Sequence, residues 1–430
     1  MAIEAEKIYL STTFPGADGG AEAVKKGDAG YSYRTVYDKF KQMYEKQGLK
    51  VTELKYPESV PLGKINKEKF KEDIHITFKP PSDAAILKGA FNIAHFAWEF
   101  PQIPTGLNQL PSKLSKENNF WRMRYFNELW VGCNFTKKVL IENGFTNVYV
   151  IPAPIEISTP IEWKIKYSSR ALEVNYLSLR RMSINLFPVV VYSNYLSYKS
   201  GDRYTSVSFG EVYKTTKIQG GTIFLQILNP FDFRKDLDTT LRAFAIHAEK
   251  KPLDILVLKL TCRPKNGEVY SSVFTKVLNK ISVLKSKNIF FTTDYIFEKD
   301  FKIFLSCFDF YFSPTRAEGQ NLPLQEAMSC GVIPVVPRHT AMLDYIFDDN
   351  SIILDSNEEL IRPSAHPDET FWGRVWNQTV IKSCVFALRT ASELSIEERK
   401  LFSKNASKRI HQNYNFESVM KLIRNRVKNY

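Results

Sequence analysis

The chain has 430 residues, 44% of them hydrophobic, which exceeds the size at which one hydrophobic core usually stops growing and favours two domains. Its formal net charge of +13 suits an acidic partner such as a phosphorylated small molecule, an anionic membrane or nucleic acid, but charge alone defines no fold. The five cysteines are scattered and form no Cys-x-x-Cys pair, which argues against a disulfide framework and a zinc knuckle.

The sequence shows no segment suited to export or to crossing a membrane. The N-terminal stretch MAIEAEKIYL has no basic region followed by an apolar run, and no apolar segment reaches the roughly 18 residues of a spanning helix. We therefore expect a cytoplasmic protein. The aromatic and basic segment FWRMRYF at 120–126 leaves open a peripheral contact with the inner face of a membrane.

The first part of the chain has the alternating pattern of an α/β domain. A strand is predicted at 7–14, followed by glycine-rich loops and a helical pattern over 33–48. Apolar runs at 90–98 and 126–134 predict further strands, and the predicted helix at 136–144 ends on a glycine. A strand, a glycine-rich loop and a helix in this order are typical of a phosphate-binding unit.

Residues 156–221 lack this alternation, and we interpret them as an irregular insertion in the first domain or a linker region between the domains. A second run of strands and helices begins at 222, and the last fifty residues are mostly helical. The sequence therefore predicts an N-terminal Rossmann-like domain at 1–221, a C-terminal Rossmann-like domain at 222–380 and helices at 381–430. Ligands of such sheets bind outside the carboxyl ends of the strands.

The stretch AEGQNLPLQEAM at 317–328 combines several features of a ligand site. It follows a predicted strand, so its loop lies at the carboxyl edge of the sheet, and Pro323 suits the first turn of the next helix. The N–H groups at the start of that helix favour a phosphate, and Gly319 allows a ligand to approach the backbone closely. Glu318 in the loop and Glu326 one turn inside the helix can bracket an elongated ligand.

This arrangement favours a nucleotide sugar. Carboxylates accept hydrogen bonds from paired sugar hydroxyls, whereas the amides at a helix start donate to phosphates. The turn after the predicted strand at 220–229 supplies Arg234 and Lys235 at the same edge of the sheet, and these cations suit a diphosphate. The alternative is that the glutamates and the cations are ordinary charges of a solvated surface.

Four segments resemble the retaining GT-B glycosyltransferases of family 4. They are EGQNLPLQEAMSCGVIPVV, NPFDFRKDLDTTLRAF, NIAHFAWEFPQIP and FNELWVGCNFTKKVLIENGFTNVYVIPAPIE. The resemblance is most specific over 222–350, weaker over 91–155 and absent over 156–221. It implies a GT-B fold, in which two Rossmann-like domains face each other across a cleft and the C-terminal helices cross back to the first domain.

The resemblance also implies roles for individual residues. Glu318 would bind the transferred sugar, Arg234 and Lys235 would clamp the diphosphate and stabilise the leaving group, and His95 would lie near the sugar, so these four are the catalytic candidates. The residues implied to bind the donor are Gly319, Gln320, Asn321, Leu322, Glu326, Tyr295, Ile296, Gly19 and Gly20. Whether Gly19-Gly20 or the second glycine loop at 27–30 approaches the diphosphate stays open.

The reaction that the resemblance implies is retaining transfer of a hexose to a glycan or lipid-linked glycan acceptor in surface polysaccharide synthesis. It requires no metal and no other cofactor, and it places the donor on the C-terminal domain and the acceptor on the N-terminal domain. The alternative is a non-catalytic protein that binds nucleotide sugars or glycans on the same scaffold. Nucleic acid is not favoured as a partner, because we find neither a basic stripe nor a known reading module.

Three further patterns have structural interpretations. Asp236-Leu237-Asp238 resembles a metal-binding Asp-x-Asp motif, but acidic residues also favour the start of a helix, which is the interpretation we adopt. His95 lies in an apolar run and also fits a hydrogen-bonded core histidine. Trp372 and Trp376 are four residues apart and fit one face of a helix.

Overall fold

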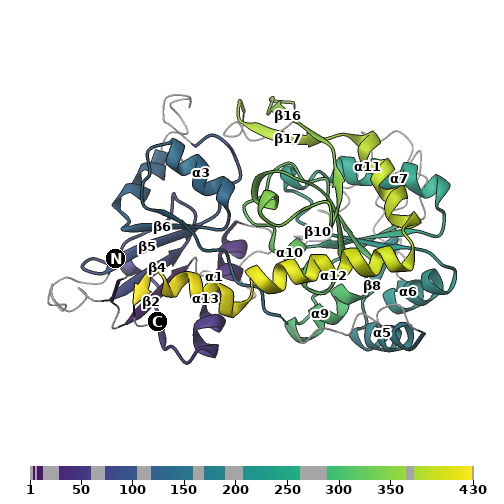
Figure 1. The fold of residues 1–430 in the computed structure, drawn as a ribbon, viewed down its shortest axis with the longest axis horizontal. Helices are drawn as coiled ribbons and strands as arrows, with labels where there is room; N and C mark the ends of the chain where they lie inside the picture. Colours follow the sequence, from purple (N-terminus) through teal and green to yellow (C-terminus); the bar gives the residue numbers. More distant parts are fainter. Residues whose placement is uncertain are drawn as a thin grey trace, which may run out of the picture.

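The chain folds into two α/β domains, which lie to the left and right in Figure 1. The computed structural model describes residues 3–4, 7–12, 29–59, 73–103, 118–157, 169–188, 207–261, 288–364 and 372–428. Each domain is built on its own sheet, as the alternation of strands and helices predicts.

The N-terminal domain contains six parallel strands in the order β3-β2-β4-β5-β6-β7. The strands are β2 (Ile8–Thr12), β3 (Val51–Glu53), β4 (Ile74–Phe78), β5 (Phe91–Phe96), β6 (Glu128–Val131) and β7 (Val148–Val150). The helices are α1 (Ala29–Lys46), α3 (Asn134–Glu142) and the 3-10 helices η1 (Pro57–Ser59) and η3 (Asn118–Tyr125). All residues of β4 and β6 are buried, as expected for parallel strands covered on both faces.

The C-terminal domain contains an eight-stranded sheet in the order β15-β14-β13-β10-β11-β12-β8-β9. Its strands are β8 (Asn185–Pro188), β9 (Val207–Ser208), β10 (Ile223–Leu228), β11 (Ile255–Leu260), β12 (Ile289–Thr292), β13 (Phe310–Phe312), β14 (Ile333–Pro337) and β15 (Ile352–Leu354). The six strands from β15 to β12 are parallel, whereas β8 and β9 are antiparallel additions at one edge.

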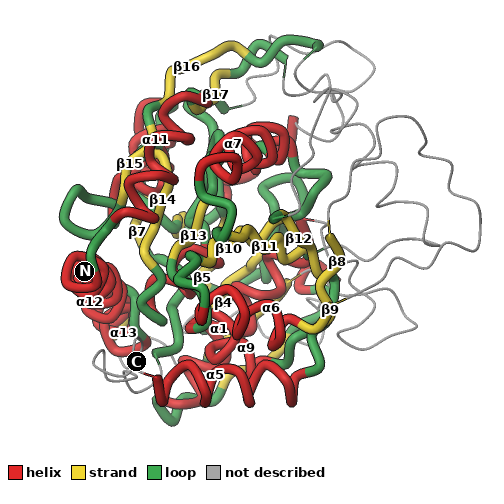
Figure 2. The backbone as a smooth tube through the Cα atoms, turned by 90° about the vertical axis from the view of Figure 1, so that its right-hand side faces the viewer, coloured by secondary structure: helices red, strands yellow, loops and turns green. Residues whose placement is uncertain are grey.

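Helices cover both faces of this second sheet (Figure 2). One face is covered by α7 (Leu237–Lys250) and α11 (Ile381–Glu393). The opposite face carries α5 (Ser169–Met182), α6 (Phe209–Ile218), α9 (Glu298–Ser306), α10 (Leu322–Ser329) and α12 (Ile396–Asn413). The short 3-10 helices η4 (Phe233–Lys235) and η5 (Thr340–Asp344) follow β10 and β14. The layered arrangement leaves the carboxyl ends of the strands free to carry functional loops.

The prediction that 156–221 is an insertion of the first domain is wrong for the residues that the structure describes. Strand β8 pairs antiparallel with β12, and Leu179, Leu186 and Phe209 belong to the same hydrophobic cluster as Leu225 of the central strand β10. The segment escaped assignment because its strands are short and antiparallel, so they lack the repeated strand and helix pattern of the rest of the domain.

The C-terminal residues connect the two domains, as the resemblance implies. Helix α12 runs along the C-terminal domain, and α13 (Phe416–Arg424) packs on the N-terminal domain (Figure 1). Val419, Met420 and Ile423 of α13 are fully buried in the core of the first domain. Strand β18 (Val427–Lys428) then pairs in parallel with β1 (Ile3–Glu4), so both ends of the described chain meet on this domain.

A hairpin connects β15 to α11 and reaches the N-terminal domain. Its strands β16 (Ser356–Leu360) and β17 (Val375–Thr379) are antiparallel. Trp376 lies in β17 and Trp372 just before it, so the expectation of a shared helical face is wrong. Indole side chains fit the pleated surface of a strand at least as well as a helix, and spacing alone did not distinguish the two.

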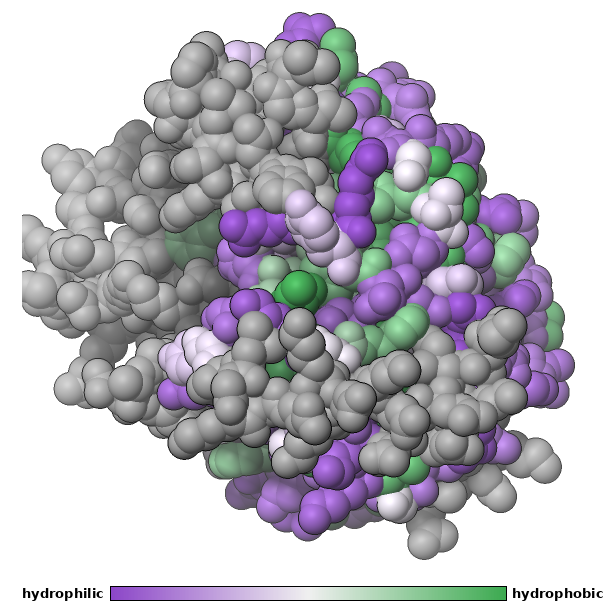
Figure 3. All heavy atoms as spheres, turned by 90° about the vertical axis from the view of Figure 1, so that its left-hand side faces the viewer, coloured by the Kyte–Doolittle hydropathy of each residue, from purple (hydrophilic) through white to green (hydrophobic). Residues whose placement is uncertain are grey.

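The aromatic and basic segment 120–126 lies partly in the core of the N-terminal domain. In this segment, Phe120, Met123 and Phe126 are buried in the core of the N-terminal domain, whereas Tyr125 is 65% exposed. No helix in the described ranges combines the length and apolar character needed to cross a bilayer. On the side of the molecule shown in Figure 3, the described residues are mostly hydrophilic, with smaller hydrophobic areas between them.

Candidate functional site

The predicted donor loop joins β13 to α10 at the carboxyl edge of the second sheet. Asn321 has a left-handed backbone (φ 63°) and caps α10, and Pro323 occupies the first turn of that helix. The N–H groups of residues 319–322 donate none of the backbone hydrogen bonds found in the described part of the chain outside regular elements. The start of α10 therefore offers donors to an anionic ligand.

Glu318 and Lys235 form an ion pair within this site. The Lys235 Nζ lies 2.6 Å from Glu318 Oε1, and the hydroxyl of Thr315 donates to the same oxygen at 2.8 Å. Glu318 is only 3% exposed, so these two donors compensate for the water that the carboxylate has lost. The backbone N–H of Glu318 in turn donates to the hydroxyl of Thr340, which fixes the loop.

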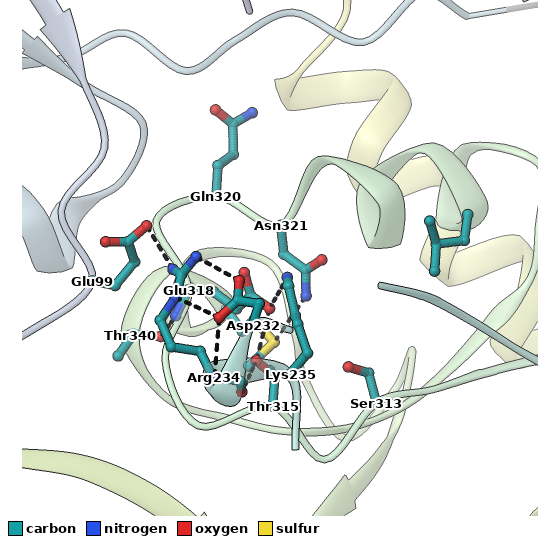
Figure 4. A network of polar contacts seen from close by, with 12 residues as sticks. Glu99, Asp232, Arg234, Lys235, Ser313, Thr315, Glu318, Gln320, Asn321 and Thr340 are labelled. Carbon is teal, nitrogen blue, oxygen red and sulfur yellow. Dashed lines mark hydrogen bonds and ion pairs between the residues drawn. The ribbon is translucent and has the colours of Figure 1, made fainter. Parts of the chain in front are cut away.

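Arg234 lies beside this pair and contacts two other carboxylates (Figure 4). Its Nε and Nη2 donate to the two oxygens of Asp232 at 3.1 and 2.8 Å, and its Nη1 lies 2.7 Å from Glu99 Oε1 of the N-terminal domain. Burial acts to lower the pKa of Arg234, but Asp232 and Glu99 outweigh it, and the pKa lies above its usual range. The guanidinium is therefore a permanent cation at the boundary between the domains.

Gln320 and Leu322 hold the two domains together through their side chains. The Gln320 amide donates to the carbonyl of Ala153 at 2.8 Å and accepts from its N–H at 2.9 Å, and Figure 4 shows this side chain pointing away from Arg234 and Glu318. Leu322 packs against the cores of both domains. Because both side chains are engaged between the domains, only the backbone at these two positions is available to contact a donor.

Glu326 has a partner from the N-terminal domain. Its Oε1 lies 2.5 Å from the Nζ of Lys39 on α1, and both side chains are only partly exposed. Asn321 differs, because its buried Oδ1 has no hydrogen-bond partner among the described residues. The structure thus brings Glu318, Lys235, Arg234 and Asn321 to one place, with Glu326 one turn further along α10.

Gly319 is packed closely against the other domain. A Cβ added at Gly319 would lie 2.7 Å from the Cβ of Ala97 and 3.5 Å from Glu99 Oε1. The sequence predicts that this glycine lets a ligand approach the backbone. In the structure, Ala97 and Glu99 of the N-terminal domain occupy the space beside it. Any side chain here would force the domains apart, because the contact atom of Ala97 is next to the backbone and cannot swing away.

His95 is a core residue of the N-terminal domain. Its Nε2 lies 2.9 Å from the carbonyl oxygen of Ile151, and its ring centre lies 5.0 and 5.3 Å from those of Phe40 and Phe78. The side chain is 4% exposed, and burial lowers its pKa to about 4. This environment matches the packing alternative, with an uncharged imidazole at neutral pH.

Three buried histidines should make the protein sensitive to acid. Burial lowers the pKa of His75, His95 and His339 to about 4 each, against 6.5 in an unfolded chain. The unfolded state therefore binds more protons between these values, and stability falls as the pH drops through this window. Each histidine should cost about 2 kcal/mol between pH 7 and pH 5. Urea unfolding at both pH values measures the loss, which His95→Gln should reduce by its own share; an unchanged loss would contradict the prediction.

The remaining predicted residues lie apart or outside the described residues. Tyr295 and Ile296 follow β12, two strands from β10, which corresponds to about 10 Å across the sheet. Tyr295 is 56% exposed and Ile296 packs on the core, so only Tyr295 is open to a ligand. Gly19 and Gly20 lie outside the described residues.

Sequence reasoning missed Glu99, Lys39, Asp232 and Thr315. Thr315 and Asp232 lie in the same predicted loops as Glu318 and Arg234, and this position could have identified them as site residues. Glu99 and Lys39 come from the other domain, and no local pattern relates them to the site. The Asp236 interpretation is confirmed, because this residue caps α7 and accepts from the N–H of Thr239. Among the described residues, no group of three His, Cys, Asp or Glu side chains could hold a metal ion.

This fold and site define the GT-B class of two-domain architecture, as predicted, and comparisons with solved structures agree. No protein-family model and no curated protein matches the sequence. HepE from Anabaena, in complex with UDP and glucose, superposes with a TM-score of 0.57 at 11% identity, covering 98% of this chain and 99% of its own.

Two further structures show the same architecture. A UDP-forming trehalose-phosphate synthase from Burkholderia xenovorans has a TM-score of 0.53 at 12% identity, covering 98% of this chain and 99% of its own. A TarM variant from S. aureus, in complex with UDP, has a TM-score of 0.52 at 13% identity and matches 85% of this chain. The chain spans 56% of TarM, about half of its length. At these identities the likeness is one of fold.

Proposed function

We propose that the chain is a glycosyltransferase that moves a hexose from a nucleoside diphosphate sugar to a glycan or lipid-linked glycan acceptor. The observation that carries the proposal is the pair of the partly buried Lys235 and the buried Glu318, 2.6 Å apart, near the start of α10. A carboxylate beside a cation and a row of N–H donors suits a sugar hydroxyl next to a diphosphate. The GT-B fold supports this assignment.

In this proposal the donor lies on the C-terminal domain. The N–H groups of 319–322 and the cations Arg234 and Lys235 bind the diphosphate, Glu318 accepts hydrogen bonds from the sugar, and Glu326 accepts them from the ribose. Tyr295, in the loop after β12, stacks on the base, because it is an exposed aromatic side chain two strands from β10; the exposed ring of Phe297 packs against it.

The chemistry follows from where charge develops. When the bond between sugar and diphosphate breaks, negative charge grows on the leaving phosphate, and fixed cations and amides stabilise it more than they stabilise the bound donor. We propose a retaining reaction without a metal ion, in which the acceptor hydroxyl attacks from the face that the diphosphate leaves. We further propose surface polysaccharide synthesis at the cytoplasmic side of the membrane as the setting.

UDP is the first nucleotide to test. The TarM and HepE structures contain UDP, and the trehalose-phosphate synthase is described as UDP-forming. Nothing about Tyr295 or Ile296 selects a base, so GDP, dTDP and CDP belong to the same panel.

A binding protein without catalysis is the second candidate. The contacts of Gly319 and Gln320 with the N-terminal domain favour it, because they bring the two domains together over the donor loop. The pair of Lys235 and Glu318 favours the enzyme, since binding alone does not require a partly buried cation beside a sugar-binding carboxylate.

A thermal-shift panel of UDP, GDP, dTDP, CDP and their common sugars, each with and without EDTA, tests the proposal. A ligand at about 100 times its dissociation constant adds about 2.7 kcal/mol to stability. We expect one nucleotide to raise the unfolding temperature equally in both conditions. Release of that nucleotide from its sugar then separates an enzyme from a binding protein. No stabilisation by any nucleotide, or stabilisation only with a metal, would overturn the proposed donor site.

A further inference from the structure

The segment 97–102 of the N-terminal domain, which we name the clasp, contacts the C-terminal domain along its length. Ala97 lies against Gly319 of the donor loop. The rings of Trp98 and Phe100 lie 5.2 and 5.5 Å from the guanidinium of Arg374, which precedes β17.

Two features at the far end of the clasp hold its position. The side-chain Oε1 of Gln102 accepts from the N–H of Val375 at 3.0 Å, and the backbone carbonyl of Gln102 accepts from the indole N–H of Trp98 at 3.1 Å. Phe100 is buried in one cluster with Ala317 and Trp376. These contacts fix the clasp on both sides of Glu99, whose own side chain contacts Arg234.

Glu99 points from this clasp at Arg234. The two side chains are about equally exposed, 21% for Glu99 and 25% for Arg234, and their oxygen and nitrogen atoms are 2.7 Å apart. In Figure 4 the carboxylate of Glu99 approaches Arg234 from the side opposite Lys235. The Glu99 carboxylate contacts Nη1 of the guanidinium, because Asp232 already accepts from Nε and Nη2.

The charges of the site do not suit a diphosphate while Glu99 is in place. The two cations Arg234 and Lys235 face three carboxylates, those of Asp232, Glu99 and Glu318. The carboxylates outnumber the cations by one, and a diphosphate would add at least two negative charges. Only Glu99 belongs to the other domain, so it is the carboxylate that can leave without disturbing the loops of the site.

We propose that Glu99 controls how strongly the donor site binds a nucleotide that carries a second phosphate. Its carboxylate competes with the terminal phosphate of a nucleoside diphosphate for Arg234. A nucleoside monophosphate, held by the start of α10 alone, leaves the Glu99–Arg234 pair intact. This inference rests on the function proposed above, and it adds a residue of the N-terminal domain to the donor site.

Removal of the competing carboxylate should tighten the binding of UDP. We expect Glu99→Gln to lower the dissociation constant of UDP about tenfold and to leave that of UMP within a factor of two. Glu99→Ala, which removes the acceptor oxygens altogether, should tighten UDP at least as much. Isothermal titration of both nucleotides against the full chain measures these constants.

Gln102→Ala is the matched control, because it weakens the same contact between domains without changing a charge. Because it frees one anchor of the clasp but keeps the Glu99 carboxylate, it should tighten UDP less than either Glu99 variant does and leave the affinity for UMP unchanged. Equal or weaker UDP binding by the two Glu99 variants, equal tightening of UMP, or equal tightening in Gln102→Ala would each overturn the inference while leaving the proposed function standing. If neither the wild type nor the Glu99 variants bind UDP, GDP, dTDP or CDP, the proposed function itself fails.

Discussion

Replacing Lys235 with methionine should lower the free energy of unfolding by about 3 kcal/mol and remove most of the donor turnover. The ammonium group lies 2.6 Å from Glu318, which is 3% exposed, so its loss leaves a buried carboxylate without a cation. The proposed reaction also needs this cation at the leaving diphosphate, and the loss of one such group lowers rates about 100-fold to 1000-fold. Urea unfolding and an assay of nucleotide release measure the two effects.

A double variant separates these effects. Lys235→Met combined with Glu318→Gln has no buried charge left at this position, so most of the lost stability should return. Its turnover should stay low, because the cation and the carboxylate are both absent. A double variant that regains turnover together with stability would show that the pair supports the fold only.

Glu318→Gln and Glu326→Gln should have different effects, although both replace a carboxylate with an amide. Glu318→Gln should lower kcat about 100-fold and change the dissociation constant of UDP by less than a factor of two, because Glu318 faces the proposed sugar. Glu326→Gln should weaken UDP about tenfold, because it faces the proposed ribose and also loses its 2.5 Å ion pair with Lys39. Steady-state kinetics and calorimetry of both variants measure the difference.

Glu249→Gln, on the exposed side of α7, is the control for the change of charge and should behave as the wild type. If Glu318→Gln and Glu326→Gln also behave as the wild type, neither carboxylate contacts a donor. Weak UDP binding by Glu318→Gln would instead place Glu318 at the nucleotide and reverse the two roles.

The central strands and part of the site could be predicted because both depend on local rules. Parallel strands covered on both faces read as continuous apolar runs, which located β10, β11 and β14. Lys235 and Glu318 follow β10 and β13, which are neighbours in the sheet, so strand order alone brings them together.

Contacts between the domains could not be predicted in this way. Glu99 and Lys39 reach Arg234 and Glu326 only because of how two separately folded units are oriented, and no periodicity in the sequence encodes that orientation. The same limit applies to Gln320, whose side chain was expected at the donor and instead binds the backbone of Ala153. His95 shows a related limit, because its burial depends on side chains far apart in the sequence, such as Phe40 and Phe78.

The return of α13 to the first domain has a consequence for folding during synthesis. Val419, Met420, Ile423 and Val427 complete a core whose other buried side chains lie between Ile8 and Ala153 in the sequence. The ribosome therefore releases almost the whole sequence before the N-terminal domain can close, whereas the C-terminal sheet is complete by residue 354. The N-terminal domain, although synthesised first, should be the last to become protease-resistant. A chain truncated before residue 416 should expose an apolar surface on that domain.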